Sequence, residues 1–296
     1  MPFLGEFSAL LTAVLWSFTS IAFSHAAEKI GSIQLNMNRL LLAALFLLLT
    51  IIVFNISYHL SSNQVINLSI SGIIGLVIGD SFLFKAYRQI GARLSILLMS
   101  FAPGLSAIMG YFLLSERISF LGVIGMIVTV MGIIIVVSER NNSPEAKYKM
   151  TAVGFFNGFM GAAGQAGGLI FAKLAFDQGD INGFVATFIR VFSSVIIFLP
   201  AVLIFRKYKN PFNMYKNNRK ALISTLGGTV FGPYLGITFS MIAVANTNVG
   251  IAATLMSTMP VLMLPLVKYI YKDKLSWRAI IGAFITVAGV ALLFLR

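Results

Sequence analysis

The sequence contains no cysteine, only two histidines and only nine acidic residues among its 296 positions. Without cysteine, the chain can form no disulfide, no thiolate zinc site and no cysteine nucleophile. His25 and His59 lack metal-ligand spacing, and the acids do not cluster with a nucleophile and a base. We therefore expect no metal, no cofactor and no enzymatic activity.

Charged residues of either sign are also scarce. They form 10% of the chain, whereas hydrophobic residues form 58% and the mean hydropathy is +0.91. A soluble domain is about 25% charged, so lipid is the expected solvent. A net charge of +13 would suggest nucleic acid in a soluble protein. Here the basic residues lie between apolar runs, which fits loops beside anionic headgroups, so we expect a bilayer and no nucleic acid as partner.

Ten apolar segments are each long enough to cross a bilayer as a helix, which needs about 20 residues. None shows the sustained alternation of a membrane strand. The sequence therefore predicts an all-α membrane protein with ten transmembrane helices. The predicted spans are 3–27, 33–54, 66–87, 94–114, 120–137, 151–176, 184–205, 221–245, 250–270 and 277–295.

The two halves of the chain repeat each other. Pairing each residue with the one 157 positions later aligns identical residues without a gap. The pairs include Gly79 with Gly236, Phe82 with Phe239, Met99 with Met256, Ser100 with Ser257, Pro103 with Pro260, Ser119 with Ser276, and Gly132 with Gly289. Five spans per half is an odd number, so the second half must enter the membrane from the opposite side. We predict two inverted five-helix repeats, 1–138 and 151–296, joined by a linker at 139–150.

These features resemble the drug/metabolite transporter superfamily, EamA branch. The resemblance rests on LLMSFAPGLSAIMGYFLLSERISFLGVIG and its partner TLMSTMPVLMLPLVKYIYKDKLSWRAIIG, which begin at residues 97 and 254. Each has a proline in the fourth helix of its half and an acidic-basic-x-Ser turn before the fifth. The resemblance covers almost the whole chain. It implies export or exchange of small metabolites, often amino acids, through a cavity lined by both halves.

Inverted repeats are typical of secondary transporters. The leading hypothesis is alternating access at a midplane cavity, with a small polar or amphipathic metabolite, amino acid-like, as substrate and export as the direction. A passive channel or facilitator is the alternative, although no selectivity filter is visible. No P-loop is present, which argues against ATP hydrolysis. We expect a monomer or a weak homodimer.

The distribution of basic residues predicts an orientation in the plasma or inner membrane. Of the 22 Lys and Arg residues, 17 lie at or beside the odd-numbered connections. The positive-inside rule then places those connections in the cytoplasm and both termini outside. The basic stretch 206–220 is predicted to be a surface loop.

Three charged residues inside spans are candidate substrate contacts. Asp80 could take a proton or contact a cationic group, or it could form an ion pair with Arg39, Arg190 or Lys85. Arg39 and Arg190 lie in the second helix of each half and could hold a carboxylate or phosphate. Alternatively, they could reach the interface or pair with Asp80.

The remaining candidates surround the proline bends and the first helix of each half. A bend at each proline would free carbonyls toward a cavity, or would serve packing alone. Trp16 aligns with Gln165, and this pair could face substrate. The candidates of this group are Trp16, Met99, Ser100, Pro103, Gln165, Tyr234, Met256, Ser257 and Pro260.

Overall fold

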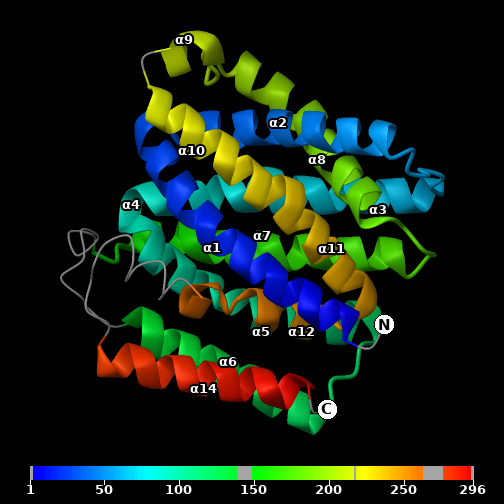
Figure 1. Cartoon of the computed structure of the whole chain (residues 1–296), viewed down its shortest axis with the longest axis vertical. Helices are drawn as coiled ribbons and strands as arrows, with labels where there is room; N and C mark the ends of the chain where they lie inside the picture. Colours follow the sequence, from blue (N-terminus) through cyan, green and yellow to red (C-terminus); the bar gives the residue numbers. More distant parts are fainter. Residues whose placement is uncertain (1–2, 139–148, 217, 263–275, 295–296) are drawn as a thin grey trace.

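The structure is a computed structural model that describes residues 3–138, 149–216, 218–262 and 276–294. Its regular elements are helical throughout these residues (Figure 1). They are α1 (Leu4–Ile30), α2 (Ser32–Val53), α3 (Ser62–Gly72), η1 (Ile73–Gly79), α4 (Asp80–Met99), α5 (Phe101–Leu114), α6 (Phe120–Ser138), α7 (Ala152–Phe176), α8 (Gly183–Ile204), α9 (Pro211–Lys216), α10 (Arg219–Thr229), η3 (Val230–Gly236), α11 (Ile237–Asn246), α12 (Val249–Met256) and α14 (Trp277–Phe294).

Eight continuous helical stretches in the described residues are long and apolar enough to cross a membrane. The third, Ser62–Gly91, joins α3, η1 and the start of α4, and the seventh, Arg219–Asn246, joins α10, η3 and α11. The other two predicted spans coincide with shorter apolar helices, Phe120–Val136 and Val249–Leu262. The all-helical, multi-pass class is thus confirmed. The count of ten stays a prediction, because the span at 250–270 runs beyond the described residues.

The lipid-facing character of these helices is visible in their side chains. Large apolar groups such as Phe112, Phe120, Ile204 and Phe284 are exposed on helices whose other faces are packed. In water such an extensive apolar surface would be unfavourable, whereas hydrocarbon accepts it and requires only that the backbone bond to itself within each helix.

The helix boundaries obey the same 157-residue shift as the sequence. The π-helical segments η1 and η3 are equivalent, residue for residue, and so are α3 and α10. The starts of α6 and α14 also correspond. The second helices of the two halves, α2 and α8, follow a slightly different offset, because they begin 151 positions apart. Each has 22 residues. The repeat therefore extends from sequence identities to local structure.

The first helix of each half packs mainly on the other half. Helix α1 contacts α10, η3, α11 and α12, whereas α7 contacts α3, η1, α4 and α5. Glycines allow this close approach: a Cβ on Gly168 would lie 3.1 Å from the Cα of Gly75, and a Cβ on Gly79 would lie 3.1 Å from the Cα of Gly164. Figure 1 shows α1 running alongside α10 and α11.

Equivalent helices also contact each other, as α2 with α8, α5 with α12, and α6 with α14. The pair α6 and α14 forms one edge of the bundle (Figure 1). Gly125 in α6 approaches Leu293 near the end of α14, and Gly132 approaches Gly282 near its start. The two helices are therefore antiparallel, so these equivalent segments run in opposite directions.

The basic stretch 206–220, expected to be a plain surface loop, is partly fixed to α2. The side chain of Gln34 donates to the carbonyl oxygen of Lys209 and accepts from its N–H, both at 2.9 Å. Asn38 accepts from the hydroxyl of Tyr208 and donates to that of Tyr215, both at 2.8 Å. The lysines and arginines of this stretch are exposed, as the prediction requires.

Candidate functional site

A cavity of about 110 Å³ lies between the two halves. It is smaller than the ~150 Å³ cavity that accepts benzene in an engineered protein, so its scale is that of a small metabolite. Both halves contribute, from α1, α2, η1 and α4 on one side and α7, α8, η3, α11 and α12 on the other. Nine of the twelve predicted site residues line it: Trp16, Arg39, Asp80, Met99, Ser100, Gln165, Arg190, Met256 and Ser257.

Irregular backbone forms part of the cavity wall. The π-helical segments supply Leu76 from η1 and Gly232 and Pro233 from η3. The α-helix is also interrupted at Ser100 and, in the equivalent place, at Ser257. Wide π turns recur at functional sites, and non-helical backbone at membrane depth is tolerated where it is buried in protein or lines a cavity. The four interruptions converge on one space.

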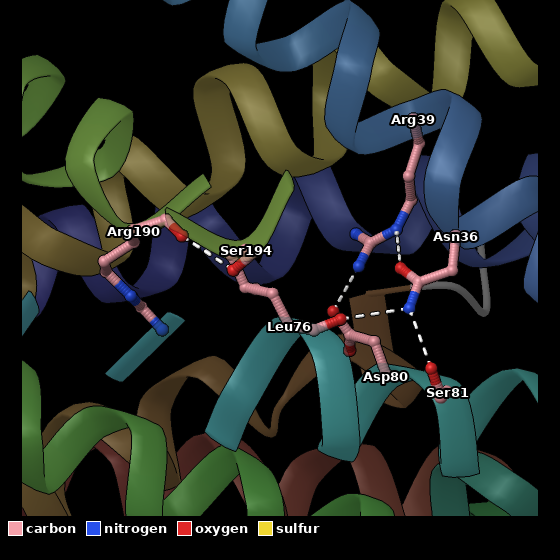
Figure 2. Close-up of polar contacts among 7 residues, drawn as sticks. All are labelled: Asn36, Arg39, Leu76, Asp80, Ser81, Arg190 and Ser194. Carbon is pink, nitrogen blue, oxygen red and sulfur yellow. Dashed lines mark hydrogen bonds and ion pairs between the residues drawn. The ribbon is translucent and has the colours of Figure 1, made fainter. Parts of the chain in front are cut away.

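Arg39 and Asp80 form an ion pair at this cavity (Figure 2). The Nε of Arg39 also donates to Asn36 Oδ1 at 3.0 Å, and the guanidinium lies 4.8 Å from the ring centre of Phe84. Asn36 in turn donates to the carbonyl oxygen of Leu76, at 3.0 Å, and to the hydroxyl of Ser81. Among the three cations considered for Asp80, the structure pairs it with Arg39.

Arg190 occupies the equivalent position of α8 but has different surroundings. Its side chain is 2% exposed, and its Nη1 lies 2.9 Å from the Sδ of Met241. Its Nε has no hydrogen-bond partner in the described part of the chain. The Oγ of Ser100, also buried, is without a partner there as well. Figure 2 shows the Arg190 guanidinium apart from the Asp80 carboxylate.

The predicted pair Trp16 and Gln165 lies at the cavity from α1 and α7. Trp16 packs against Gly236 at the end of η3, where any Cβ would clash with the indole. Met99 and Met256 are at the ends of α4 and α12, beside the helix interruptions. These positions bring the first and fourth helices of both halves to the same space.

Three candidates do not line the cavity. Pro103 and Pro260 are buried beside it. Pro103 lies in the first turn of α5, where a backbone N–H has no partner within the helix, so its missing N–H costs little. The interruption of the helix is at Ser100 and not at the proline. The hydroxyl of Tyr234 lies 2.8 Å from that of Thr50 in α2, so Tyr234 faces the α2 side of the helix.

Four residues that shape the site are not among the candidates predicted from the sequence. Asn36 precedes Arg39 by three residues, a helical spacing that could have revealed their contact. Phe84 and Met241 contact the two arginines and are related by the 157-residue shift. Pro233 lies within a span without a helix end nearby, an anomaly that could have marked η3.

A second acidic residue has a defined role outside the spans. Glu116, between α5 and α6, accepts a hydrogen bond from the backbone N–H of Val249 at the start of α12, at 2.9 Å to Oε2. Burial raises the pKa of this carboxyl above its ordinary value, against the lowering effects of that bond and of Lys173. Glu116 thus caps α12 and ties the two halves together.

The sequence profile of the EamA-like transporter family matches residues 3–138 and 152–295. The chain belongs to the EamA-like transporter family. It is therefore a multi-pass membrane transporter of the drug/metabolite transporter superfamily, as the sequence motifs predicted.

A solved structure described as "Crystal structure of protein" aligns with 100% of this chain and 98% of its own, with a TM-score of 0.77 and 16% identity. At that identity the likeness shows the fold alone. No match is found among curated proteins. In the described residues, no group of three or more His, Asp or Glu side chains is placed to hold a metal ion.

Proposed function

We propose that this EamA family member is a secondary carrier that moves a small amphipathic metabolite, amino acid-like in size, by alternating access at the 110 Å³ cavity. The observation that carries the proposal is that equivalent elements of both halves, η1 with η3 and Ser100 with Ser257, meet at one space. A rocking of one half against the other would change both walls of that space together.

The antiparallel packing of α6 and α14 supports inverted insertion of the two halves. Ten spans then place both termini on one side of the membrane. The basic connections favour a cytoplasmic position for the loop that contains α9, with export from the cytoplasm as the proposed direction. The membrane is proposed to be the plasma or inner membrane.

Counterflow in liposomes tests the carrier. Purified protein should accelerate saturable uptake of a labelled solute when the same solute is loaded inside. Ala253→Phe, which fills the cavity wall, should abolish this exchange. Gly104→Ala should preserve it, because an added Cβ there would meet no atom of the described residues within 4 Å outside its own stretch of helix. Flux that rises linearly with concentration and shows no exchange would instead establish a channel.

A further inference from the structure

The two halves present the cavity with equivalent side chains of unequal charge. In the first half, Arg39 meets Asp80 and the ring of Phe84. The 157-residue shift replaces Asp80 by Ile237 and Phe84 by Met241. Arg190 corresponds to Arg39 at the 151-residue offset that relates α2 and α8. Arg39, Asp80, Arg190 and Ile237 all line the cavity. The repeat thus retains both cations and supplies an acid for only one of them.

The guanidinium of Arg39 has its charge and hydrogen-bond partners within the protein itself. Its guanidinium has a carboxylate, an amide oxygen from Asn36 and an aromatic face from Phe84. These partners provide the charge compensation and the hydrogen bonds that a buried guanidinium requires. Nothing further is needed at this side of the cavity.

Arg190 is equally buried and forms no ion pair within 4.0 Å among the described residues, although Asp80 is near enough to interact with its charge. The neighbour of its Nη1 is the thioether of Met241, a weak acceptor without charge, and its Nε has no partner in the described residues. Burying an unpaired cation is strongly unfavourable. Ser100 adds a second unpartnered polar group, its Oγ, to the wall of the same cavity. Both groups are more than nine-tenths buried.

The rest of the wall indicates what kind of ligand would fit. Among the described residues of the lining, the charged ones are Arg39, Asp80 and Arg190, which sum to one positive charge. Most of the other lining residues are apolar or aromatic. They include Trp16, Phe23, Phe84, Met99 and Met256. A ligand with one negative charge and an apolar body would neutralise the site and cover this wall.

We propose that Arg190 and Ser100 bind the carboxylate of an amphipathic monocarboxylate. This carboxylate would compensate Arg190 as Asp80 compensates Arg39, because the position equivalent to Asp80 is Ile237. This assignment rests on the proposed function, since it treats the cavity as the substrate site. A carboxylate carries the single charge that balances Arg190, whereas a phosphate monoester carries about −1.5 to −2 at pH 7. The carboxylate would accept from the guanidinium and from the serine hydroxyl.

Trp16 provides a reporter inside the cavity. The chain has two tryptophans, and the other, Trp277, is 73% exposed on α14. Trp277→Phe therefore leaves fluorescence from Trp16 alone. In this background, purified protein in detergent is titrated with 3-methylbutanoate, its uncharged amide and 3-methylbutylamine, which suit a small cavity. The three probes share one branched chain and differ in charge, and the carboxylate should bind about tenfold or more tightly than the amide, with the amine weakest.

Two variants then locate the anion. Arg190→Gln removes the cation, and Ile237→Asp supplies Arg190 with an internal carboxylate, so each should reduce the affinity of the carboxylate to that of the amide. Arg219→Gln removes an exposed arginine at the start of α10 and should leave the affinity unchanged. The Ile237→Asp result matters most, because that variant retains Arg190.

Equal binding of carboxylate and amide, preferred binding of the amine, or no binding of any probe would overturn the assignment, even if neither variant folds. An unchanged carboxylate affinity in folded Ile237→Asp or Arg190→Gln protein would also overturn it. The carrier is judged separately by counterflow. Saturable exchange without carboxylate preference removes only the anion site, whereas carboxylate binding without exchange removes only the carrier.

Discussion

The guanidinium of Arg39 in α2 forms an ion pair with the carboxylate of Asp80, the first residue of α4. The side chains are 5% and 17% exposed, so solvent screens the pair only weakly. The same α2 residue reaches Asn36 and Phe84. The pair therefore joins α2 to the segment where η1 ends and α4 begins, which is part of the cavity wall.

Asp80→Asn should destabilise the protein by about 3 kcal/mol, because it leaves Arg39 buried without a counter-charge. Thermal unfolding in detergent measures this effect. Asp177→Asn is the matched control, since Asp177 pairs with Lys173 at 3.7 Å with its side chain 48% exposed. Its effect should be below about 1 kcal/mol. Equal losses in the two variants would show that the Arg39 pair contributes no more than a surface pair.

The buried carboxyl of Glu116 should make the stability of the protein depend on pH. Burial raises the pKa of its carboxyl in the folded protein above 4.5, so the folded state keeps this proton to higher pH than the unfolded state does. The contribution to stability is therefore present below pH 4.5 and is lost as the pH rises through the folded pKa. As the pH rises through that range, the melting temperature of the wild type should fall relative to that of Glu116→Gln. A difference that is constant with pH would contradict this prediction.

The contact between α6 and α14 depends on glycine. A Cβ on Gly132 would lie 2.7 Å from the carbonyl oxygen of Gly282, and backbone cannot move aside as a flexible side chain can. Gly132→Ala should therefore lower the melting temperature. Gly104→Ala should leave it unchanged or raise it slightly, because an added Cβ meets no described atom within 4 Å outside its own stretch of helix. If both variants behaved alike, the close packing of α6 on α14 would be refuted.

The proposed orientation can be tested with surface labels. Lys216, exposed at the end of α9, should be labelled only from the cytoplasmic face, and a tag after the C-terminus only from the opposite face. The other exposed lysines of the loop are first removed by substitution. Intact cells and inverted vesicles are then treated with a membrane-impermeant amine reagent, and comparison of the two distinguishes the two faces. Labelling of Lys216 in intact cells would reverse the orientation.

The sequence predicted most of the fold because its signals are repeated. Each half carries the same spacing of glycines, prolines and turns, so an identity such as Gly132 with Gly289 supports the boundaries of two helices at once. The linker at 139–150 and the end of the ninth span fall largely outside the described residues. They stay predictions, as does the division into domains 1–138 and 151–296.

The candidate site was predictable where a charged residue lies within an apolar run. Arg39, Asp80 and Arg190 are conspicuous there, and all three line the cavity. Their partners were not predictable in the same way, since which of three cations faces Asp80 depends on the rotation and crossing of α2 and α4. The π turns of η1 and η3 also escaped, because an extra residue per turn leaves no mark in hydrophobicity.

Because α1 and α7 each pack mainly on the other half, neither half completes its own packing. A polypeptide containing only one copy would expose the surface on which the absent partner's leading helix should lie. A single-copy ancestor would thus have needed a sister chain threaded through the membrane the other way up, and gene fusion would have made that partnership permanent. During synthesis α7 is therefore available to α3, α4 and α5 as soon as the second copy begins, whereas α1 waits for α10, α11 and α12.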